Sequence, residues 1–309
     1  MYGYLMKARA PNTVKKYENY FLKWQSWAVR YGVVPLPTTD YDVSLYLVAL
    51  LQEGSSCHVI ESTVYAIKWK HEISGYEVPL QLLVRNLVEA SKRIAKPDRK
   101  PKEPLTPDIL RSIFVNIGGR EADLLSQRKF VFLLLSYAGF LRFDEASFLR
   151  VADLTFFPTH MTVFIEKSKT DVYRDGRTLV ISKLNSDLCP VKATRGYIDR
   201  AGMEESSFLF RPLIWLKSRQ RYRLTARNRP LSYTTCRSDA LRLFEKVGLT
   251  KGILGLHSAR SGGASWAANA GVPDRLFKRH GRWVSERAKD SYVKDNLASL
   301  LCVSRNLGL

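Results

Sequence analysis

Two short stretches near the C-terminal end of the sequence concentrate residue types that can act on a phosphate group. LGLHSARSGG places His257 and Arg260 three positions apart, so that on a helix both side chains share one face and can grip one anion. HGRWVSERAKDSYV contains Tyr292, whose phenol is a candidate nucleophile. Small residues at positions 261–264 would let another segment of backbone pass close to the predicted helix.

A second arginine follows a predicted buried helix. The run FVFLLLSYAGFL is apolar on all sides, which is typical of a helix in the centre of a domain, and it ends near Gly139. Arg142 comes at once afterwards, and a buried guanidinium is costly unless an anion meets it. That anion is either Asp144 or Glu145 in a structural ion pair, or a substrate phosphate. With the other cationic groups, Arg142 would form a cage for a phosphodiester whose non-bridging oxygens gain charge during attack by tyrosine.

The overall charge favours a polyanionic partner. Lys and Arg number 49 against 29 Asp and Glu, a formal net charge of +20, and neutralising phosphates releases counterions and so favours binding. The scattered cysteines fit a reducing compartment rather than a zinc site or a disulfide framework. We therefore expect no metal and no cofactor. The sequence has no apolar run long enough for a membrane helix and no secretory signal, so the protein is not expected to be membrane-bound or secreted.

The first third of the chain predicts a helical bundle. Apolar stripes at helical spacing predict helices over about 11–32, 40–53, 58–74 and 80–95, and these form a first domain, residues 1–95. The aromatic residues in these stripes are interpreted as core rather than as a platform for stacking bases.

A linker is predicted after the bundle. KPDRKPKEP, residues 96–104, is rich in proline and basic residues, and it either lies along a phosphate backbone or is only a solvated tether. Its candidate DNA contacts are Arg99, Lys100 and Lys102.

The second domain, residues 105–309, is predicted to combine helices with a small antiparallel sheet. MTVFIEKSKT and RTLVIS are rich in β-branched residues and flank DVYRDG, whose Asp-Gly predicts a hairpin. Lys167 and Lys169 stand two apart near its tip, on one face of the strand. The basic run between predicted helices at 190–201 and 232–247 is interpreted as a phosphate-facing loop, with Arg219, Arg221 and Arg223 as candidate DNA contacts. The predicted fold class is mostly α, with two domains.

Taken in order, Arg142, a hairpin lysine, the HSAR motif, a tryptophan and Tyr292 resemble the tyrosine recombinases, also called the phage integrase family. The resemblance covers both predicted domains, and HSARSGGASWAANAGV is most similar to the Cre-type enzymes. The KRHGRW and KDSYV segments resemble recombinases of eukaryotic mobile elements of the Crypton and DIRS sort. The resemblance identifies His257 and Arg260 as the HxxR motif, Glu145 as the acidic residue that follows Arg142, and Tyr292 as the nucleophile.

Two further catalytic positions remain open between neighbours. The lysine that protonates the leaving group falls best on Lys169, in S-K-T, with Lys167 as the alternative. The position that holds His or Trp in the family falls on Trp283, nine residues before the tyrosine. His280 competes for this role, since helical spacing would put both side chains on one face; Trp283 is favoured.

The resemblance implies a clamp around double-stranded DNA, a 3′-phosphotyrosine intermediate and a homo-tetramer on DNA, from a monomer or dimer in solution. A type IB topoisomerase-like enzyme and a domesticated, non-catalytic DNA-binding protein are the alternatives. The expected compartment is the nucleus if the source is a eukaryotic mobile element, and the bacterial cytoplasm otherwise.

Overall fold

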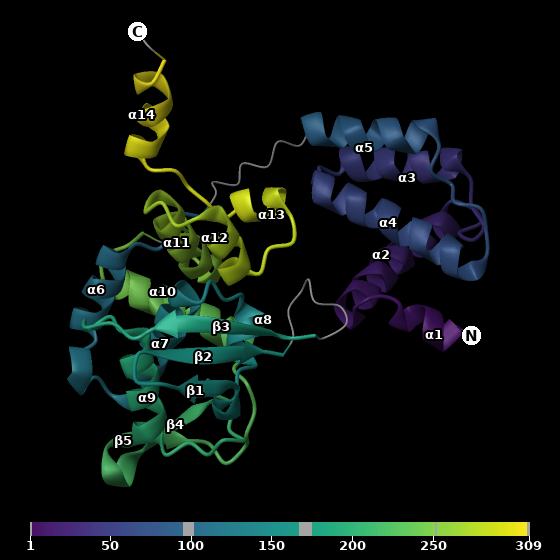
Figure 1. The fold of residues 1–309 in the computed structure, drawn as a ribbon. Coiled ribbons are helices and arrows are strands. Elements are labelled where there is room, and N and C mark those ends of the chain that lie inside the picture. Colours follow the sequence, from purple (N-terminus) through teal and green to yellow (C-terminus); the bar gives the residue numbers. More distant parts are fainter. Residues whose placement is uncertain (1, 95–101, 167–174, 251, 308–309) are drawn as a thin grey trace. The chain divides into compact units, whose positions relative to one another are not determined.

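The structure, a computed structural model, describes residues 2–94, 102–166, 175–250 and 252–307. The chain divides into two compact units, Met1–Lys100 and Pro101–Leu309 (Figure 1). The described residues are mostly helical and include two small antiparallel sheets, which confirms the predicted fold class. None of the described helices combines the length and the apolar character that crossing a membrane requires.

The first unit is a helical bundle with a core of its own. Its core includes Trp24 and Leu47, both fully buried, so the aromatic stripe is core, as predicted. The four predicted helices are present, and a short helix that was not predicted precedes them. The helices are α1 (Tyr2–Lys7), α2 (Pro11–Arg30), α3 (Asp40–Gln52), α4 (Cys57–Ser74) and α5 (Leu82–Ile94).

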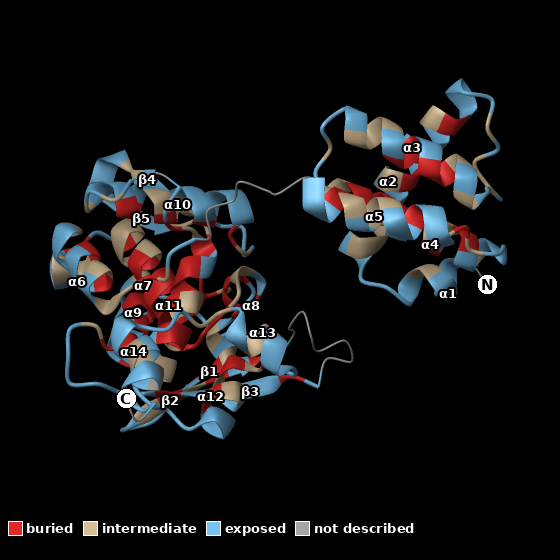
Figure 2. Cartoon of the chain, turned by 90° about the horizontal axis from the view of Figure 1, so that it is seen from above, coloured by how far each residue is buried: buried red, intermediate tan, exposed pale blue. Residues whose placement is uncertain are grey.

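The second unit is built around one buried helix, α7, as its uniformly apolar sequence predicts. Burial is concentrated where α7 packs against α9 and α11 (Figure 2). The helices of this unit are α6 (Pro107–Asn116), α7 (Leu124–Ala138), α8 (Phe143–Ser147), α9 (Pro190–Ala201), α10 (Tyr233–Lys246), α11 (Leu256–Asn269), α12 (Asp274–Gly281), α13 (Glu286–Asp290) and α14 (Leu297–Arg305).

A three-stranded antiparallel sheet of order β1-β2-β3 lies in the second unit, formed by β1 (Leu154–Phe156), β2 (His160–Ile165) and β3 (Arg177–Ser182). The predicted hairpin is confirmed, because β2 and β3 pair antiparallel with Ile165 opposite Arg177, and the segment 166–176 connects them. Gly176 leads into β3 with φ +68°, at a point where a Cβ atom would lie 2.5 Å from the Phe164 ring. Lys167 and Lys169 fall within this connection, outside the described residues.

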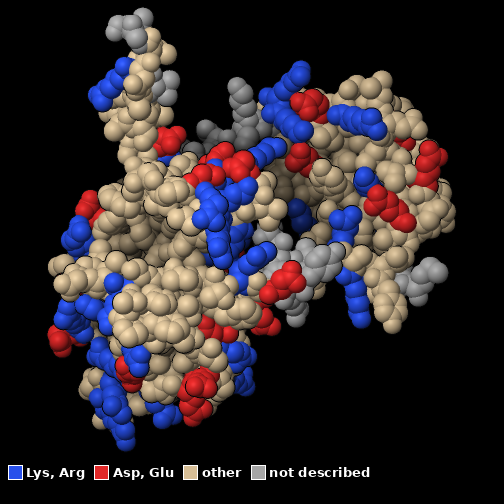
Figure 3. Space-filling view, viewed as in Figure 1, with Lys and Arg blue, Asp and Glu red and all other residues tan. Residues whose placement is uncertain are grey.

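The basic run before α10 was predicted to be a loop, but its first part, up to Leu224, belongs to a hairpin. Strands β4 (Leu213–Leu216) and β5 (Arg221–Leu224) pair directly, and the rings of Trp215 and Tyr222 lie 4.8 Å apart. These aromatic side chains favour strands, a signal that the density of basic residues obscured. Arg219, Arg221 and Arg223 are exposed, and basic side chains gather at this end of the second unit (Figure 3).

The end of the predicted linker is held against the second unit. The backbone N–H of Glu103 donates to the Ile253 carbonyl over 3.0 Å, and the ammonium of Lys102 donates to the Gly252 carbonyl. The rest of that segment, including Arg99 and Lys100, lies outside the described residues.

Candidate active site

Helix α11 carries His257 and Arg260 three positions apart on one turn, as their spacing predicts. Its small residues allow close packing: a Cβ atom on Gly262 would lie 1.9 Å from the Leu105 carbonyl oxygen, and one on Gly263 would lie 2.1 Å from the Tyr137 carbonyl oxygen. The backbone of α11 is therefore pressed against α7 and the start of the unit. Arg260 is fully buried by this packing, whereas His257 lies exposed at the start of the helix.

Arg142 lies just before α8 and pairs with Glu145. Its guanidinium donates to Glu145 Oε1 over 2.7 Å, and its backbone N–H donates to Oε2 over 2.9 Å. Of the two carboxylates left open by the sequence, Glu145 is the partner. The Glu145 side chain is 1% exposed and that of Arg142 is 14% exposed, so Arg142 still reaches the surface of the unit.

Arg260 occupies the centre of the site. Its guanidinium donates to the Gly281 carbonyl over 2.9 Å and to the Phe140 carbonyl, and it lies 3.6 Å from Glu145 Oε2. The ring of Trp283 lies 5.0 Å from the guanidinium carbon, and that of Tyr292 lies 4.6 Å from it. Arg260 and Tyr292, predicted to act together, are therefore in direct contact.

The electrostatics of the site reflect burial among like charges. Burial, assisted by the charge of Arg142, lowers the pKa of Arg260 to about 10, which still leaves it protonated at neutral pH. Burial alone would raise the pKa of Glu145, but the guanidinium of Arg282 and the Arg142 backbone N–H outweigh this and lower it. Both groups are therefore ionised near neutral pH.

The segment that carries Tyr292 is bound to the helix that carries Arg260. Ser261 Oγ donates to the Tyr292 carbonyl over 2.8 Å, and Ser265 Oγ accepts from the Lys294 backbone N–H over 2.8 Å. The amide of Asn269 donates to the Lys294 carbonyl over 2.9 Å. These three positions repeat every fourth residue of α11, so one helix face fixes the tyrosine segment next to Arg260.

His280 and Trp283 do not share a helix face, so the expectation from their spacing is wrong. Helix α12 ends at Gly281, because Arg282 takes a left-handed conformation with φ +56°. His280 Nε2–H donates to the Ala138 carbonyl over 2.9 Å, and burial lowers the pKa of its imidazole. Trp283 instead contacts Tyr292, with 5.8 Å between ring centres. This geometry places Trp283, and not His280, next to Tyr292.

Sequence reasoning missed Arg282. Its guanidinium lies 2.9 Å from Glu145 Oε2, so three arginines surround that one carboxylate. In a chain this basic, an additional arginine gives no signal of its own.

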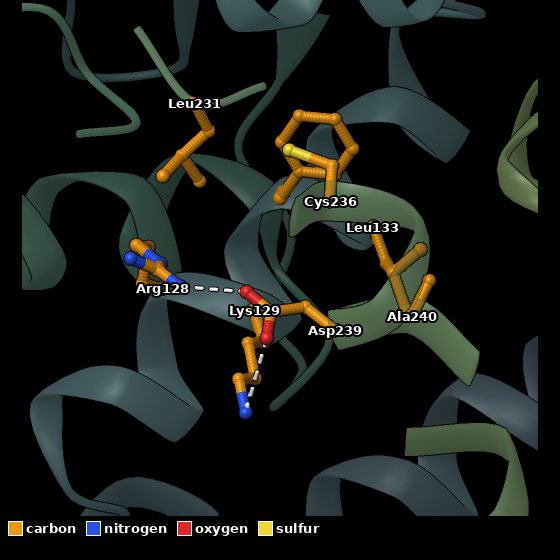
Figure 4. Close-up of a pocket in the computed structure, with 8 residues that line it drawn as sticks. Arg128, Lys129, Leu133, Leu231, Cys236, Asp239 and Ala240 are labelled. Atoms are coloured by element: carbon orange, nitrogen blue, oxygen red, sulfur yellow. Dashed lines mark hydrogen bonds and ion pairs between the residues drawn. The ribbon is translucent and has the colours of Figure 1, made fainter. Parts of the chain in front are cut away.

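Another buried arginine, Arg128 of α7, lies in a separate ionic cluster. It donates to Asp239 over 2.6 Å and to the Arg211 carbonyl over 3.1 Å, and Lys129 lies 3.3 Å from Asp239 (Figure 4). Here a carboxylate is shared by two cations from one helix, and no tyrosine lines the small pocket beside it. The described residues contain no group of three or more His, Cys, Asp or Glu side chains that could hold a metal ion.

The whole chain has known relatives in sequence and in fold. An integrase/recombinase XerD homolog from Selenomonas ruminantium is 24% identical over 301 residues, which cover 94% of this chain and 83% of the relative. XerH site-specific recombinase bound to a palindromic difH substrate has a TM-score of 0.66 at 12% identity, covering 95% of this chain and 79% of that one. The chain is therefore similar in sequence to an integrase/recombinase over most of its length, and similar in fold to site-specific recombinases. No protein-family model matches it.

Two further solved structures share the fold of this chain. A Tn1549 transposon integrase in complex with transposon right-end DNA has a TM-score of 0.65 at 16% identity, covering 100% of this chain and 98% of the other. A lambda integrase tetramer bound to a Holliday junction has a TM-score of 0.58 at 16% identity, covering 93% of this chain and 73% of the other. The sequence relative is bacterial, and none of these comparisons supports the eukaryotic mobile-element origin suggested by the sequence.

Proposed function

We propose that this chain is a site-specific DNA recombinase that cleaves and rejoins strands of double-stranded DNA through a 3′-phosphotyrosine intermediate. The observation that carries the proposal is the charge of the site. Arg142, Arg260 and Arg282 surround one carboxylate, Glu145, with the ring of Tyr292 directly over Arg260. A buried excess of positive charge is costly, and an anion such as a DNA phosphate would compensate it.

The proposed reaction follows from these positions and from the family resemblance. The phenol of Tyr292 loses its proton to solvent as its oxygen attacks the phosphorus, a bond forms between oxygen and phosphorus, and the 5′-oxygen of the next nucleotide leaves. Arg142, Arg260 and His257 stabilise the charge that grows on the non-bridging oxygens. Lys169 donates a proton to the departing oxygen. Attack by that 5′-hydroxyl, or by one from another strand, reverses the step and releases the tyrosine.

The proposal extends to assembly and to DNA contacts. The lambda integrase tetramer on a Holliday junction supports a DNA-bound homo-tetramer for this chain as well. Domains at 1–95 and 105–309, joined by a linker at 96–104, would surround the duplex. Phosphate contacts are proposed for Arg99, Lys100, Lys102, Arg219, Arg221 and Arg223.

Covalent capture tests the function without knowledge of the target sequence. The purified chain is incubated with genomic DNA of its source organism, including the DNA that flanks this gene, after random nicking with DNase I. A nick close to the cleavage site lets the short strand diffuse away, so the covalent intermediate accumulates. We expect SDS-stable adducts at one recurrent sequence, with the nucleotide on Tyr292 by mass spectrometry. A chain that binds this DNA but forms no adduct is not a strand-cleaving enzyme.

A plasmid with two copies of the captured sequence then separates the two enzymatic alternatives. Exchange of the segment between the copies is expected of a recombinase. Relaxation of supercoils without exchange would instead indicate a type IB topoisomerase-like enzyme.

The identity of the general acid can be predicted with a modified substrate. Sulfur in place of the bridging 5′-oxygen gives a leaving thiolate, which needs little protonation. We expect Lys169→Ala to slow cleavage of normal DNA by about 10²-fold, since general acids contribute at least this much, and to cleave the sulfur substrate almost normally.

Lys167→Ala is the matched control. We expect it to slow cleavage only modestly, and by the same factor on normal DNA and on the sulfur-containing substrate. If the sulfur substrate restores cleavage only for Lys167→Ala, Lys167 is the general acid. If it restores cleavage for neither variant, neither lysine is the general acid.

The C-terminal helix is proposed to connect protomers. Asn269 Oδ1 accepts from the Ser299 hydroxyl over 3.0 Å at the start of α14, yet Leu297 and Leu300 are 69% and 59% exposed. Exposed apolar surface of this kind favours docking on a second copy. We expect truncation after Val293 to reduce the DNA-bound tetramer to smaller species by light scattering. A tetramer of unchanged mass would show that α14 packs on its own domain.

A further inference from the structure

Arg282 combines two unfavourable features at one position. Its backbone has φ +56°, a conformation that residues other than glycine and asparagine rarely adopt, and its side chain is 5% exposed. The preceding Gly281 leaves no room for a side chain, since a Cβ atom there would lie 2.0 Å from the Trp283 ring. An arginine kept in such a place must be fixed by strong contacts.

The contacts of Arg282 join the two segments that frame the site. One terminal nitrogen of its guanidinium donates to the Gly139 carbonyl over 3.1 Å and to the His280 carbonyl over 2.8 Å. The other donates to the Phe140 carbonyl over 2.9 Å and to Glu145 Oε2 over 2.9 Å. Arg282 thereby connects the turn between α7 and α8 to the end of α12.

Glu145 divides its two oxygens among three guanidinium groups. Oε1 binds the Arg142 side chain over 2.7 Å, and Oε2 binds Arg282 over 2.9 Å while lying 3.6 Å from Arg260. Arg260 has its hydrogen bonds elsewhere, at the Phe140 and Gly281 carbonyls. Without Arg282, the nearest guanidinium left for Oε2 besides that of Arg142 would be that of Arg260.

We propose that Arg282 is a positioning residue for strand cleavage. By occupying Glu145 Oε2, it prevents this carboxylate from drawing Arg260 out of the position in which it faces the scissile phosphate. It also adds to the positive charge of the reacting site, because three guanidinium groups meet one carboxylate and leave a positive excess for the phosphate. The inference rests on the proposed function, because it concerns the same phosphate.

A purely structural role for Arg282 makes a different prediction from this one. If Arg282 only fixed the turn, neutralising Glu145 in addition would slow cleavage further. If Arg282 acts by holding Glu145 away from Arg260, neutralising the carboxylate removes the cause of the defect. The second change should then partly restore cleavage, a coupling that a double-mutant cycle measures.

The test compares wild type, Arg282→Gly, Glu145→Gln and the double variant. Glycine suits the left-handed backbone and so offsets part of the lost stability. Each protein is measured for DNA affinity and for its single-turnover rate of adduct formation on the nicked DNA captured by the wild type.

We expect Arg282→Gly to cleave about 10²-fold more slowly, comparable to loss of one preorganised donor, with affinity changed by less than about threefold. The double variant should cleave at least about tenfold faster than Arg282→Gly.

Three outcomes would overturn this inference. They are wild-type cleavage by Arg282→Gly, a double variant slower than either single variant, and a loss of DNA affinity as large as the loss of rate. If Arg282→Gly does not fold, Arg282→Lys keeps one charge but cannot make both sets of contacts. Folded Arg282→Lys that cleaves at the wild-type rate would then refute the role. Absence of adduct with the wild type would instead refute the proposed function.

Discussion

Replacing Tyr292 by phenylalanine is expected to abolish the covalent protein–DNA adduct while leaving DNA affinity unchanged. The phenylalanine ring can keep the contacts of the tyrosine ring, which lies 4.6 Å from the Arg260 guanidinium carbon and 5.8 Å from the Trp283 ring. The backbone contacts with Ser261 and Ser265 involve the carbonyl and remain. The substitution removes only the hydroxyl that we propose forms the bond to phosphorus, so it is expected to abolish the chemical step without weakening DNA binding. The measurement is adduct yield on nicked DNA at saturating enzyme.

Tyr233→Phe is the matched control. The ring of Tyr233 packs edge-on against that of Phe143, which follows Arg142, with 5.2 Å between ring centres. The Tyr233→Phe substitution therefore also removes one tyrosine hydroxyl from the second unit. We expect it to form adduct at the wild-type yield. A normal yield from Tyr292→Phe would assign the nucleophile to another residue.

Most helices could be predicted because their apolar stripes are strong and local. The same holds for His257 and Arg260, whose spacing of three places them on one turn. The close approach at Gly262 and Gly263 was also foreseeable, since only small residues permit it. In each case the signal lies within a few positions of sequence.

The parts that could not be predicted depend on contacts between distant segments. Helix α12 stops before Trp283 because Gly281 must accommodate the Trp283 ring and because the Gly139 and Phe140 carbonyls hold Arg282 in its left-handed conformation. From sequence spacing alone, the helix was predicted to extend through Trp283. The β4–β5 hairpin was missed because β5 alternates Arg221 and Arg223 with Tyr222 and Leu224, and its arginines are also typical of a basic loop.

Replacing Arg260 by alanine is expected to slow strand cleavage by about 10²–10³-fold, the usual cost of removing one preorganised donor from a charged transition state. The change also leaves Glu145 with fewer cations and the Phe140 and Gly281 carbonyls without their donor. Some loss of stability will therefore accompany the loss of rate. The measurement is the single-turnover cleavage rate, together with the thermal midpoint and DNA affinity of the same protein.

Arg128→Ala controls for that loss of stability, because Arg128 is also a buried arginine in an ion pair, 2.6 Å from Asp239, but lies in the separate cluster of Figure 4. We expect it to lower the thermal midpoint by a similar amount while cleaving DNA within about threefold of the wild-type rate, since it removes no donor from the phosphate. EDTA should change the wild-type rate little, because arginines supply the positive charge that a metal supplies in other phosphoryl-transfer sites. Equal losses of rate in the two arginine variants would show that Arg260 acts only through stability, and cleavage that requires added magnesium would contradict an arginine-based site.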